Sequence, residues 1–511
     1  MSSYDKPLHW LVERAGRLFK DSAIIFKGER YSYEWLSSTS SSIAGWLAER
    51  GVSSGRRVAL LMANHPLLAA CIHAVSRTGA AAVLLNPLLK PREVAYLVED
   101  SDAELIVADP ARLKVAEEAA RGRAVACAQG GRGPSLDEAL SRPRPPPSVE
   151  VDPGDVAVIQ YTAGTTGEPK GAMLTHRGLV FNAAAIAEAV ELRRGELQLG
   201  ALPLYHSYGL TNVLNASLYA GASVALMERF EVEEALRLIE ELRVNVWFGV
   251  PTMFIAALHH LKQRRHDLSS LRFCNSGGGP MPVELMEEFE RLTGVLFMQG
   301  YGLTEASPVT HSNVPRPGLV RKASVGQPLP GTEAKVVDLE TGSRNLPPGE
   351  LGEIVVRGPH VMKGYWRRPK ETSEALRDGW LYTGDVGWVD EEGYFYVVDR
   401  KKDVIKYKGY TVSPREIEDV LYQHPAVKEC AVVGRPSELV GEEPVAFVAL
   451  KEGCSASPEE LMKFVEERVA PYKKLRAVFF IDEVPKSPVG KVLRRELRRR
   501  LAELSSTPQR A

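Results

Sequence analysis

Apolar and polar positions along the chain follow two alternating patterns. Short apolar runs, typical of buried strands, occupy residues 57–63, 81–86 and 104–108, and a longer stretch with helical spacing occupies residues 65–79. Strands that alternate with helices in this way predict βαβ units and mostly parallel sheets. We therefore predict an α/β fold, with a large N-terminal domain whose mostly parallel sheets are flanked by helices.

Two changes in residue composition along the chain suggest where one domain ends and the next begins. A proline-rich segment at residues 141–155 is typical of an exposed connector. After residue 398 the composition changes, and several lysines cluster around a glycine. Helical and strand-like patterns follow, and then a basic terminal helix at 491–504. We predict a large domain over residues 1–399 and a small, mobile α+β domain over residues 400–511, joined by a hinge.

Composition narrows the class of protein. The chain has 511 residues, 44% apolar and 25% charged content and a formal net charge of -1, which gives no basic field for nucleic acid. No apolar leader and no apolar run of membrane-spanning length is apparent, so we expect a cytoplasmic protein without a transmembrane segment. The cysteines lack zinc-ligand spacing and are expected to be buried thiols: Cys71, Cys127, Cys274, Cys430 and Cys454.

The segment YTAGTTGEPKG at residues 161–171 has the chemistry of a phosphate-binding loop. Its glycines let backbone N–H groups approach phosphate oxygens, while the hydroxyls of Thr162, Thr165 and Thr166 add donors and Lys170 adds a charge. Thr175 is the expected N-cap of the helix that follows. The spacing does not fit G-x-x-x-x-G-K-[ST], so the common NTPase loop is excluded. From composition alone, a polar turn is an equal alternative.

Further motifs follow in the order PLYHSYGL (203–210), NSGGGPMP (275–282), QGYGLTEAS (299–307), YTGD (382–385), DRKKDVIKYKG (399–409) and VPKSPVGKVLRR (484–495). Three consecutive glycines allow the backbone to lie flat against a planar ligand. Tyr301 offers a stacking face, and Glu305 alone suffices for a Mg²⁺ ion held mainly by phosphates. The Asp385 carboxylate can accept from ribose hydroxyls. In isolation, the other reading of each motif is structural: a core histidine, a loop, a surface glutamate and solvated lysines.

Together, these motifs resemble those of the adenylate-forming enzymes, the superfamily of acyl-CoA synthetases, firefly luciferase and peptide-synthetase adenylation domains. The family loop is written [YF]-T-S-G-T-T-G-x-P-K-G, and Ala163 replaces its serine. Thr411 is a second departure, because many relatives carry glutamine there. The resemblance covers nearly the whole chain, and the shared order is more specific than any one motif.

The resemblance implies roles for individual residues. Catalysis is assigned to Lys491, Glu305 and His206, with Glu305 also holding the metal. The acyl pocket is assigned to His206, Tyr208, Gly278 and Gly279, the hinge to Lys402, and the thioester step to Lys406, Lys408 and Gly409. The residues assigned to ATP and AMP are Thr162, Thr165, Thr166, Gly167, Lys170, Gly278, Gly279, Pro280, Tyr301, Gly302, Thr304, Asp385, Arg400 and Lys491.

The function implied is that of an AMP-forming acyl-CoA synthetase that uses ATP, Mg²⁺ and coenzyme A, with a medium- or long-chain fatty acid as the expected substrate. An aryl acid such as a coumarate or benzoate is the nearest alternative. An adenylation enzyme that loads a carrier protein and a non-catalytic acyl-nucleotide binding protein are further ones. For the basic terminal helix we favour packing over contact with an anionic membrane. The sequence leaves the oligomeric state open.

Overall fold

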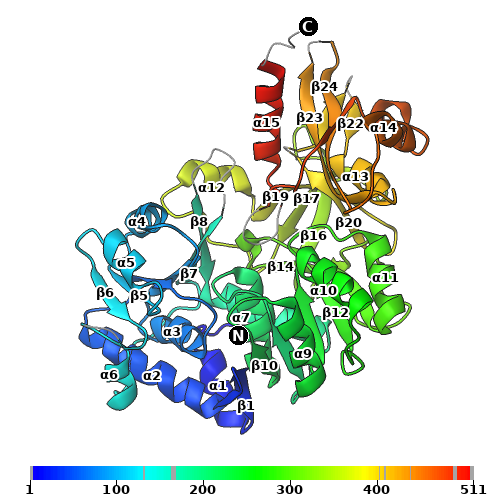
Figure 1. Cartoon of the computed structure of the whole chain (residues 1–511). Coiled ribbons are helices and arrows are strands. Elements are labelled where there is room, and N and C mark those ends of the chain that lie inside the picture. The colour runs from blue at the N-terminus through cyan, green and yellow to red at the C-terminus, as the bar shows by residue number, and fades with distance from the viewer. Residues whose placement is uncertain are drawn as a thin grey trace.

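The computed structural model describes residues 4–130, 133–162, 169–401, 403–407, 410–437, 439–486 and 492–506. Within these ranges the strands form four sheets (Figure 1), and the predicted α/β class with a large N-terminal and a small C-terminal part is confirmed. Most of the apolar runs read from the sequence are the buried strands of these sheets.

The first sheet is nearly all parallel. Its strands are, in spatial order, β6 (Ala124–Cys127), β5 (Leu105–Ala108), β3 (Arg57–Leu61), β4 (Ala81–Leu85), β7 (Val156–Thr162) and β8 (Lys170–Thr175). Only β7 and β8 pair in antiparallel fashion. The central strands are apolar throughout because helices cover both faces of the sheet.

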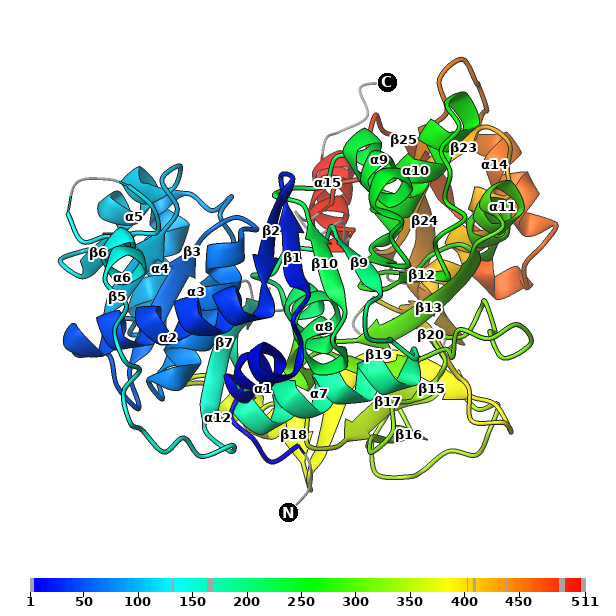
Figure 2. The ribbon, with the colours of Figure 1, turned by 90° about the horizontal axis from the view of Figure 1, so that it is seen from below.

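The second sheet is mixed and lies beside the first (Figure 2). Its strands are, in spatial order, β15 (Gln327–Pro328), β14 (Val309–Ser312), β13 (Leu296–Gly302), β12 (Phe273–Ser276), β11 (Val246–Gly249), β9 (Leu197–Gly200), β10 (Ser223–Leu226), β1 (Ser22–Phe26) and β2 (Glu29–Ser32). The strands from β13 through β1 are parallel, and antiparallel strands close both edges.

The third and fourth sheets occupy the C-terminal third of the chain. The third contains β16 (Glu333–Val337), β17 (Gly352–Arg357), β18 (Leu376–Arg377), β19 (Trp380–Val389) and β20 (Phe395–Arg400). The fourth contains β21 (Ile405–Tyr407), β22 (Tyr410–Val412), β23 (Val427–Ser437), β24 (Gly441–Leu450) and β25 (Ala477–Phe480). The change of sheet falls between Arg400 and Ile405. The domain boundary between residues 399 and 400 stays a prediction.

Helices cover the sheets and link them. Those of the large part are α1 (Trp10–Leu18), α2 (Tyr33–Glu49), α3 (Pro66–Arg77), α4 (Pro91–Asp100), α5 (Leu113–Ala119), α6 (Asp137–Ser141), α7 (His176–Ala189), α8 (Ala216–Ala220), α9 (Val232–Leu242), α10 (Pro251–Gln263), α11 (Val283–Thr293) and α12 (Pro369–Ala375), with a π-helix, η1 (Gly209–Asn215), and a 3₁₀ turn, η2 (Thr304–Ala306). The small part has α13 (Pro414–Tyr422), α14 (Pro458–Glu466), η3 (Pro471–Lys473) and α15 (Arg494–Ser506). In Figure 1 the small part stands above the large one, with α15 beside β23.

Helix α7 joins the two large sheets, because it contacts β7 and β8 on one side and β14 on the other. The predicted N-cap is present: the Thr175 hydroxyl accepts from the N–H of Gly178 at 3.0 Å. The local order differs from the expected strand, loop and helix, since β8 intervenes between the loop and α7. Pairing of Lys170 with Thr162 across β7 and β8 therefore brings together the two ends of the glycine-threonine loop.

Two further sequence predictions can be compared with the structure. Four of the cysteines are buried as expected, but Cys454 is exposed, because it lies in the loop between β24 and α14. The proline-rich connector has no helix or strand between residues 142 and 155. In the described part of the chain, no helix combines the length and the apolar character that crossing a membrane requires.

Candidate active site

Four of the predicted motifs converge because each follows the carboxyl end of a strand in a parallel part of a sheet. The glycine-threonine loop follows β7 at Thr162, the His206 segment follows β9 at Gly200, the triple glycine follows β12 at Ser276, and the Thr304 turn follows β13 at Gly302. Ligands of α/β proteins bind in the crevice outside the carboxyl ends of the strands. The topology thus explains why motifs spread over some 140 residues can share one site.

Asp385 forms the polar centre of this region. The phenol of Tyr301 donates to its Oδ2 at 2.5 Å, and Nε of Arg400 lies 2.6 Å from its Oδ1. Burial, together with the nearby carboxylate, raises the pKa of Tyr301 well above its usual value, so the phenol remains a donor. The carboxylate is 4% exposed and the Arg400 side chain 45%, so the arginine covers it from the solvent side. Each carboxylate oxygen keeps a lone pair for a further donor.

Glu305 lies in η2, directly after β13. Its Oε1 accepts from the Tyr365 hydroxyl at 2.8 Å, and its carbonyl oxygen accepts from the N–H of Met362. Nζ of Lys170 lies 5.0 Å from the centroid of the Tyr365 ring. The structure thus brings Lys170 to the ring and Glu305 to the hydroxyl of one tyrosine, although 135 positions separate them in the sequence.

A cavity lies between these groups and α7. Its wall consists of Ile186, His206, Ser207, Tyr208, Asn212, Asn275, Gly277, Gly278, Gly300, Tyr301, Gly302, Leu303, Thr304, Pro308, Val309 and Ser312. Six of the residues predicted from the motifs are among them: His206, Tyr208, Gly278, Tyr301, Gly302 and Thr304. Asp385 is not part of the wall, but it accepts a hydrogen bond from the wall residue Tyr301. Gly279 and Pro280 follow the wall residue Gly278 in the chain, and their roles stay predictions.

Tyr208 lies between the cavity and Phe248 of the second sheet. Its ring packs edge-on against Phe248, and its hydroxyl donates to the carbonyl oxygen of Asn275 at 3.4 Å. Burial raises the pKa of Tyr208, so this hydroxyl is neutral. At the other end of the segment, Nδ1 of His206 accepts from the N–H of Tyr208 at 3.2 Å, which fixes the orientation of the imidazole.

Two glycines of the wall admit no side chain. A Cβ on Gly302 would lie 2.1 Å from the carbonyl oxygen of Pro308, and one on Gly277 would lie 2.8 Å from the Tyr208 hydroxyl. A Cβ on Gly278 would make an ordinary contact with Val250 at 3.5 Å, but the φ of 77° favours glycine there, and a Cβ on Gly279 would lie 3.7 Å from Pro251. The close approach predicted for the triple glycine therefore occurs at Gly277, one residue before those singled out from the sequence.

Sequence reasoning missed several residues of this site, among them Asn212, Asn275, Gly277 and Tyr365. Asn275 and Gly277 lie inside the recognised NSGGGPMP motif, from which only the following residues, 278–280, were singled out. Asn212 lies two residues after the recognised PLYHSYGL segment, among other polar residues, and so carries no distinct signal in the sequence. Tyr365 lies in no recognised motif.

Several predicted residues lie outside the described part of the chain: Thr165, Thr166, Gly167, Lys402, Lys408, Gly409 and Lys491. The backbone of Lys406 belongs to β21, but its side chain is outside the description too. Their roles in phosphate binding, hinge motion and catalysis stay predictions.

The donor groups at the site fit a divalent cation only in combination with a ligand. In the described residues, three or more histidine, cysteine or acidic side chains nowhere gather as a metal site. Glu305 supplies one carboxylate, and a Mg²⁺ ion that keeps several phosphate and water oxygens needs no more than one or two from the protein.

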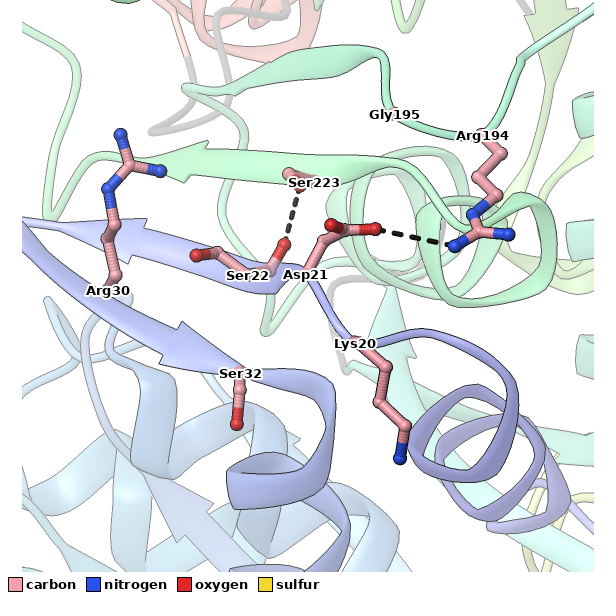
Figure 3. Close-up of a pocket in the computed structure, with 8 residues that line it drawn as sticks. All are labelled: Lys20, Asp21, Ser22, Arg30, Ser32, Arg194, Gly195 and Ser223. Carbon is pink, nitrogen blue, oxygen red and sulfur yellow. Dashed lines mark hydrogen bonds and ion pairs between the residues drawn. The ribbon is translucent and has the colours of Figure 1, made fainter.

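A separate pocket lies at the opposite edge of the second sheet (Figure 3). It surrounds Ser22 and Ser223, the first residues of β1 and β10. Ser223 donates to the carbonyl oxygen of Ser22 at 2.5 Å, and Arg194 lies 3.7 Å from Asp21. Because it opens at the amino ends of the strands, this pocket takes no part in the site described above.

Comparison with known proteins places this fold and site in a family. The model of the AMP-binding enzymes matches residues 11–366, and that of the AMP-binding enzyme C-terminal domain matches residues 416–491. The chain therefore belongs to the family of AMP-binding enzymes, and the resemblance seen in its motifs is confirmed.

Three relatives illustrate the range of this family. The chain is 38% identical to a long-chain-fatty-acid–CoA ligase of Bacillus subtilis (strain 168) over 95% of its length and 93% of the relative. It is also 38% identical to a feruloyl-CoA synthase of an Amycolatopsis species, over 96% of this chain and 98% of the relative. Among solved structures, ATP-bound MatB from Rhodopseudomonas palustris aligns with a TM-score of 0.90 at 31% identity, over 98% of this chain and all of the other.

Proposed function

We propose that this protein is an ATP-dependent acid–thiol ligase. It converts a carboxylic acid and ATP into an acyl-adenylate and pyrophosphate, and then transfers the acyl group to coenzyme A with release of AMP. The arrangement of Tyr301, Asp385 and Arg400 beside the cavity that holds His206 carries this proposal. Both curated relatives described above are named for the formation of coenzyme A thioesters, and the similar MatB structure contains ATP.

The first step overcomes the poor leaving ability of a carboxylate oxygen. An oxygen of the acid attacks the α-phosphorus of ATP, the bond from that phosphorus to the bridging oxygen breaks, and pyrophosphate leaves with the electron pair. Two anions must approach one another, so positive charge at the site lowers the barrier. We assign this role to Lys170 and Lys491, and we assign the ribose hydroxyls to Asp385.

Glu305 is the residue that would hold Mg²⁺. The ion, when bound, neutralises charge on the phosphates of ATP. The bond from Tyr365 occupies Oε1 of Glu305 and fixes the orientation of the carboxylate, leaving Oε2 for the ion. Thr304, the preceding residue, directs its hydroxyl toward Ser207 at 3.4 Å and lines the same cavity, where it can donate to a phosphate or acyl oxygen.

The second step uses the thiol of coenzyme A. Its thiolate attacks the acyl carbonyl, the bond from that carbon to the phosphate oxygen breaks, and AMP leaves, so no protein residue becomes acylated. We propose that the small domain turns about Lys402 between the steps, withdrawing Lys491 and presenting Lys406, Lys408 and Gly409. A thiol on a carrier protein is the alternative acceptor.

The acid is proposed from two classes. A medium- or long-chain fatty acid is our first candidate from the sequence, and the relative from Bacillus subtilis is named for a long-chain fatty acid. An aryl acid is the second candidate, and the equally similar Amycolatopsis relative is named for feruloyl-CoA. The polar groups in the cavity wall, Asn212 and Asn275, favour the second class.

Pyrophosphate release across acids of graded chain length and a set of aromatic acids tests the proposal, with and without coenzyme A. We expect release to depend on the acid and acyl-CoA to appear only with coenzyme A. AMP release that depends on the acid but yields no acyl-CoA would indicate a carrier protein as acceptor. If the protein binds ATP but releases pyrophosphate with none of the acids, it would be a non-catalytic binding protein.

The variant that tests the proposed catalytic lysine is Lys491→Ala, which should lower pyrophosphate release by about a hundredfold or more. Its matched control is Lys114→Ala, because Lys114 lies exposed in α5. Equal rates in the two variants would refute the role of Lys491.

A further inference from the structure

Asn212 is a buried polar residue that lines the cavity. It lies in the π-helix η1, a rare element that is frequent at functional sites. The residue is 2% exposed, and its amide oxygen has no hydrogen-bond partner among the described residues. The residue is part of the cavity wall. Buried polar atoms are nearly always paired, and Asn212 both has an unpaired buried atom and lines the cavity, so a ligand there can supply the missing partner.

The main chain at this position is held firmly. Nε2 of Gln198 donates both to the carbonyl oxygen of Asn212, at 3.2 Å, and to the Ser217 hydroxyl, at 2.8 Å. One residue earlier, the Thr211 hydroxyl donates to the carbonyl oxygen of Ser307 at 2.8 Å. These bonds fix the backbone from both sides, so the orientation of the Asn212 side chain is set before a ligand enters.

The other residues of the wall indicate what kind of ligand the cavity can hold. Ile186, Leu303 and Val309 are apolar, and the Tyr208 ring, backed by Phe248, adds an aromatic face. A mainly apolar body with a polar atom beside Asn212 satisfies this part of the wall, whereas a purely apolar tail would leave the Asn212 oxygen without a partner. Asn212 follows His206 by six residues, which corresponds to roughly 9 Å or less along a helix at about 1.5 Å per residue.

We propose that the acid carries a hydroxyl group on its tail, remote from the carboxylate, and that this hydroxyl donates a hydrogen bond to Oδ1 of Asn212. The substrate class is then a hydroxylated acid with a compact apolar or aromatic body, such as a ring-hydroxylated aryl acid. This inference rests on the proposed ligase function, because it assumes that the acid occupies the cavity with its carboxylate toward His206.

The test compares acids that differ in one group. The kcat/KM for pyrophosphate release is measured with 4-hydroxycinnamate, cinnamate and 4-methoxycinnamate, and with 8-hydroxyoctanoate and octanoate. Of the two hydroxylated acids, the one with the higher kcat/KM should exceed the matching acid without the hydroxyl by about ten- to hundredfold in kcat/KM. The reason is that the acid without the hydroxyl leaves a buried group unpaired. The methoxy acid, which cannot donate, should behave like cinnamate.

The variant Asn212→Leu should bring the ratio of hydroxy to deoxy acid close to one, mainly by changing KM. Asn345→Leu is the matched control, because Asn345 is exposed in the loop between β16 and β17. The ratio is independent of the fraction of folded enzyme, and the wild-type ratio tests the inference even if Asn212→Leu does not fold.

Three outcomes overturn the inference: equal kcat/KM for both members of each pair in the wild type, an unchanged ratio in Asn212→Leu, or a methoxy acid as good as the hydroxy acid. If no acid releases pyrophosphate, the proposed function fails instead. Calorimetric binding of the same acids, which requires no chemistry, then decides whether the hydroxyl is recognised: equal affinities within each pair would overturn the inference and a preference for the hydroxy acid would support it.

Discussion

The hydroxyl of Tyr301 donates to Oδ2 of Asp385 at 2.5 Å, although the two residues belong to different sheets. Tyr301 lies on β13 of the second sheet and Asp385 on β19 of the third. Arg400, on the neighbouring strand β20, engages the other carboxylate oxygen. Through Asp385, these contacts connect β13, which lines the cavity, to β20, which leads into the small domain.

The first prediction concerns Asp385→Asn, which keeps the shape of the side chain but removes its charge. We expect KM for ATP to rise by about ten- to a hundredfold, because a charged acceptor for the proposed ribose hydroxyls is lost. Steady-state kinetics with varied ATP measure this effect. The exposed Asp482→Asn is the control, and an unchanged KM for ATP in Asp385→Asn would contradict the assignment.

The second prediction concerns Glu305→Gln and its dependence on Mg²⁺. An amide oxygen can still accept from Tyr365, but it binds a divalent cation more weakly than a carboxylate oxygen, so the midpoint of a Mg²⁺ titration should move to higher concentration. Tyr365→Phe removes the hydrogen bond and keeps the carboxylate, so its midpoint should shift less. Identical midpoints in the wild type and Glu305→Gln would exclude Glu305 as the ligand.

The third prediction concerns His360, which is fully buried and stacks on Phe181 with ring centroids 5.5 Å apart. Burial lowers the pKa of His360 to about 3, so the folded protein keeps the ring neutral. The contribution of His360 to the free energy of unfolding is therefore fully present above its pKa in the unfolded chain, about 6.5, and is lost as the pH falls toward 3. By pH 5 the loss in free energy of unfolding should be about 2 kcal/mol.

The variant His360→Leu checks this prediction by chemical denaturation at pH 7.5 and pH 5. It should lose less stability between the two values than the wild type does. The control is His259→Leu on α10, where the side chain is exposed and little is desolvated. The same pH dependence in wild type and His360→Leu would show that the histidine ionises without penalty.

The fourth prediction concerns a buried ion pair in the small part. Arg494 of α15 meets Glu418 of α13 in a bidentate contact at 2.5 and 3.0 Å, with side chains 13% and 9% exposed. Glu418→Gln leaves the arginine without its counter-charge, so the free energy of unfolding of this part should fall by about 3 to 5 kcal/mol. Hydrogen exchange of β23, which α15 covers, would report the loss.

Two comparisons make this test specific. The double variant Glu418→Leu with Arg494→Leu should lose less than Glu418→Gln, because no charge remains buried. The exposed pair Arg237 and Glu241 on α9, at 2.7 Å, is the surface control, and Glu241→Gln should change stability by less than about 1 kcal/mol. A loss in Glu418→Gln as small as this control would contradict the prediction.

The sequence predicted the fold because its local signals agree with one another. The apolar runs at residues 57–63 and 81–86 are strands β3 and β4, and Thr175 caps α7 as expected. Strand β8 was missed, since its residues follow a glycine-rich loop and pair with β7 only after the chain has turned back. Such pairing depends on a neighbour that local patterns do not encode.

Residues with distinctive chemistry were found from the sequence itself: Glu305, Asp385 and the glycines carry their signal in local motifs, and the order of those motifs gave the family. Only the tertiary structure showed that Tyr365 joins Lys170 to Glu305 and that Asn212 faces the same cavity as His206. The physical reason is that a motif records what one segment can do, whereas a cavity forms where several strands end, and its unpaired atoms appear only when every neighbour is in place.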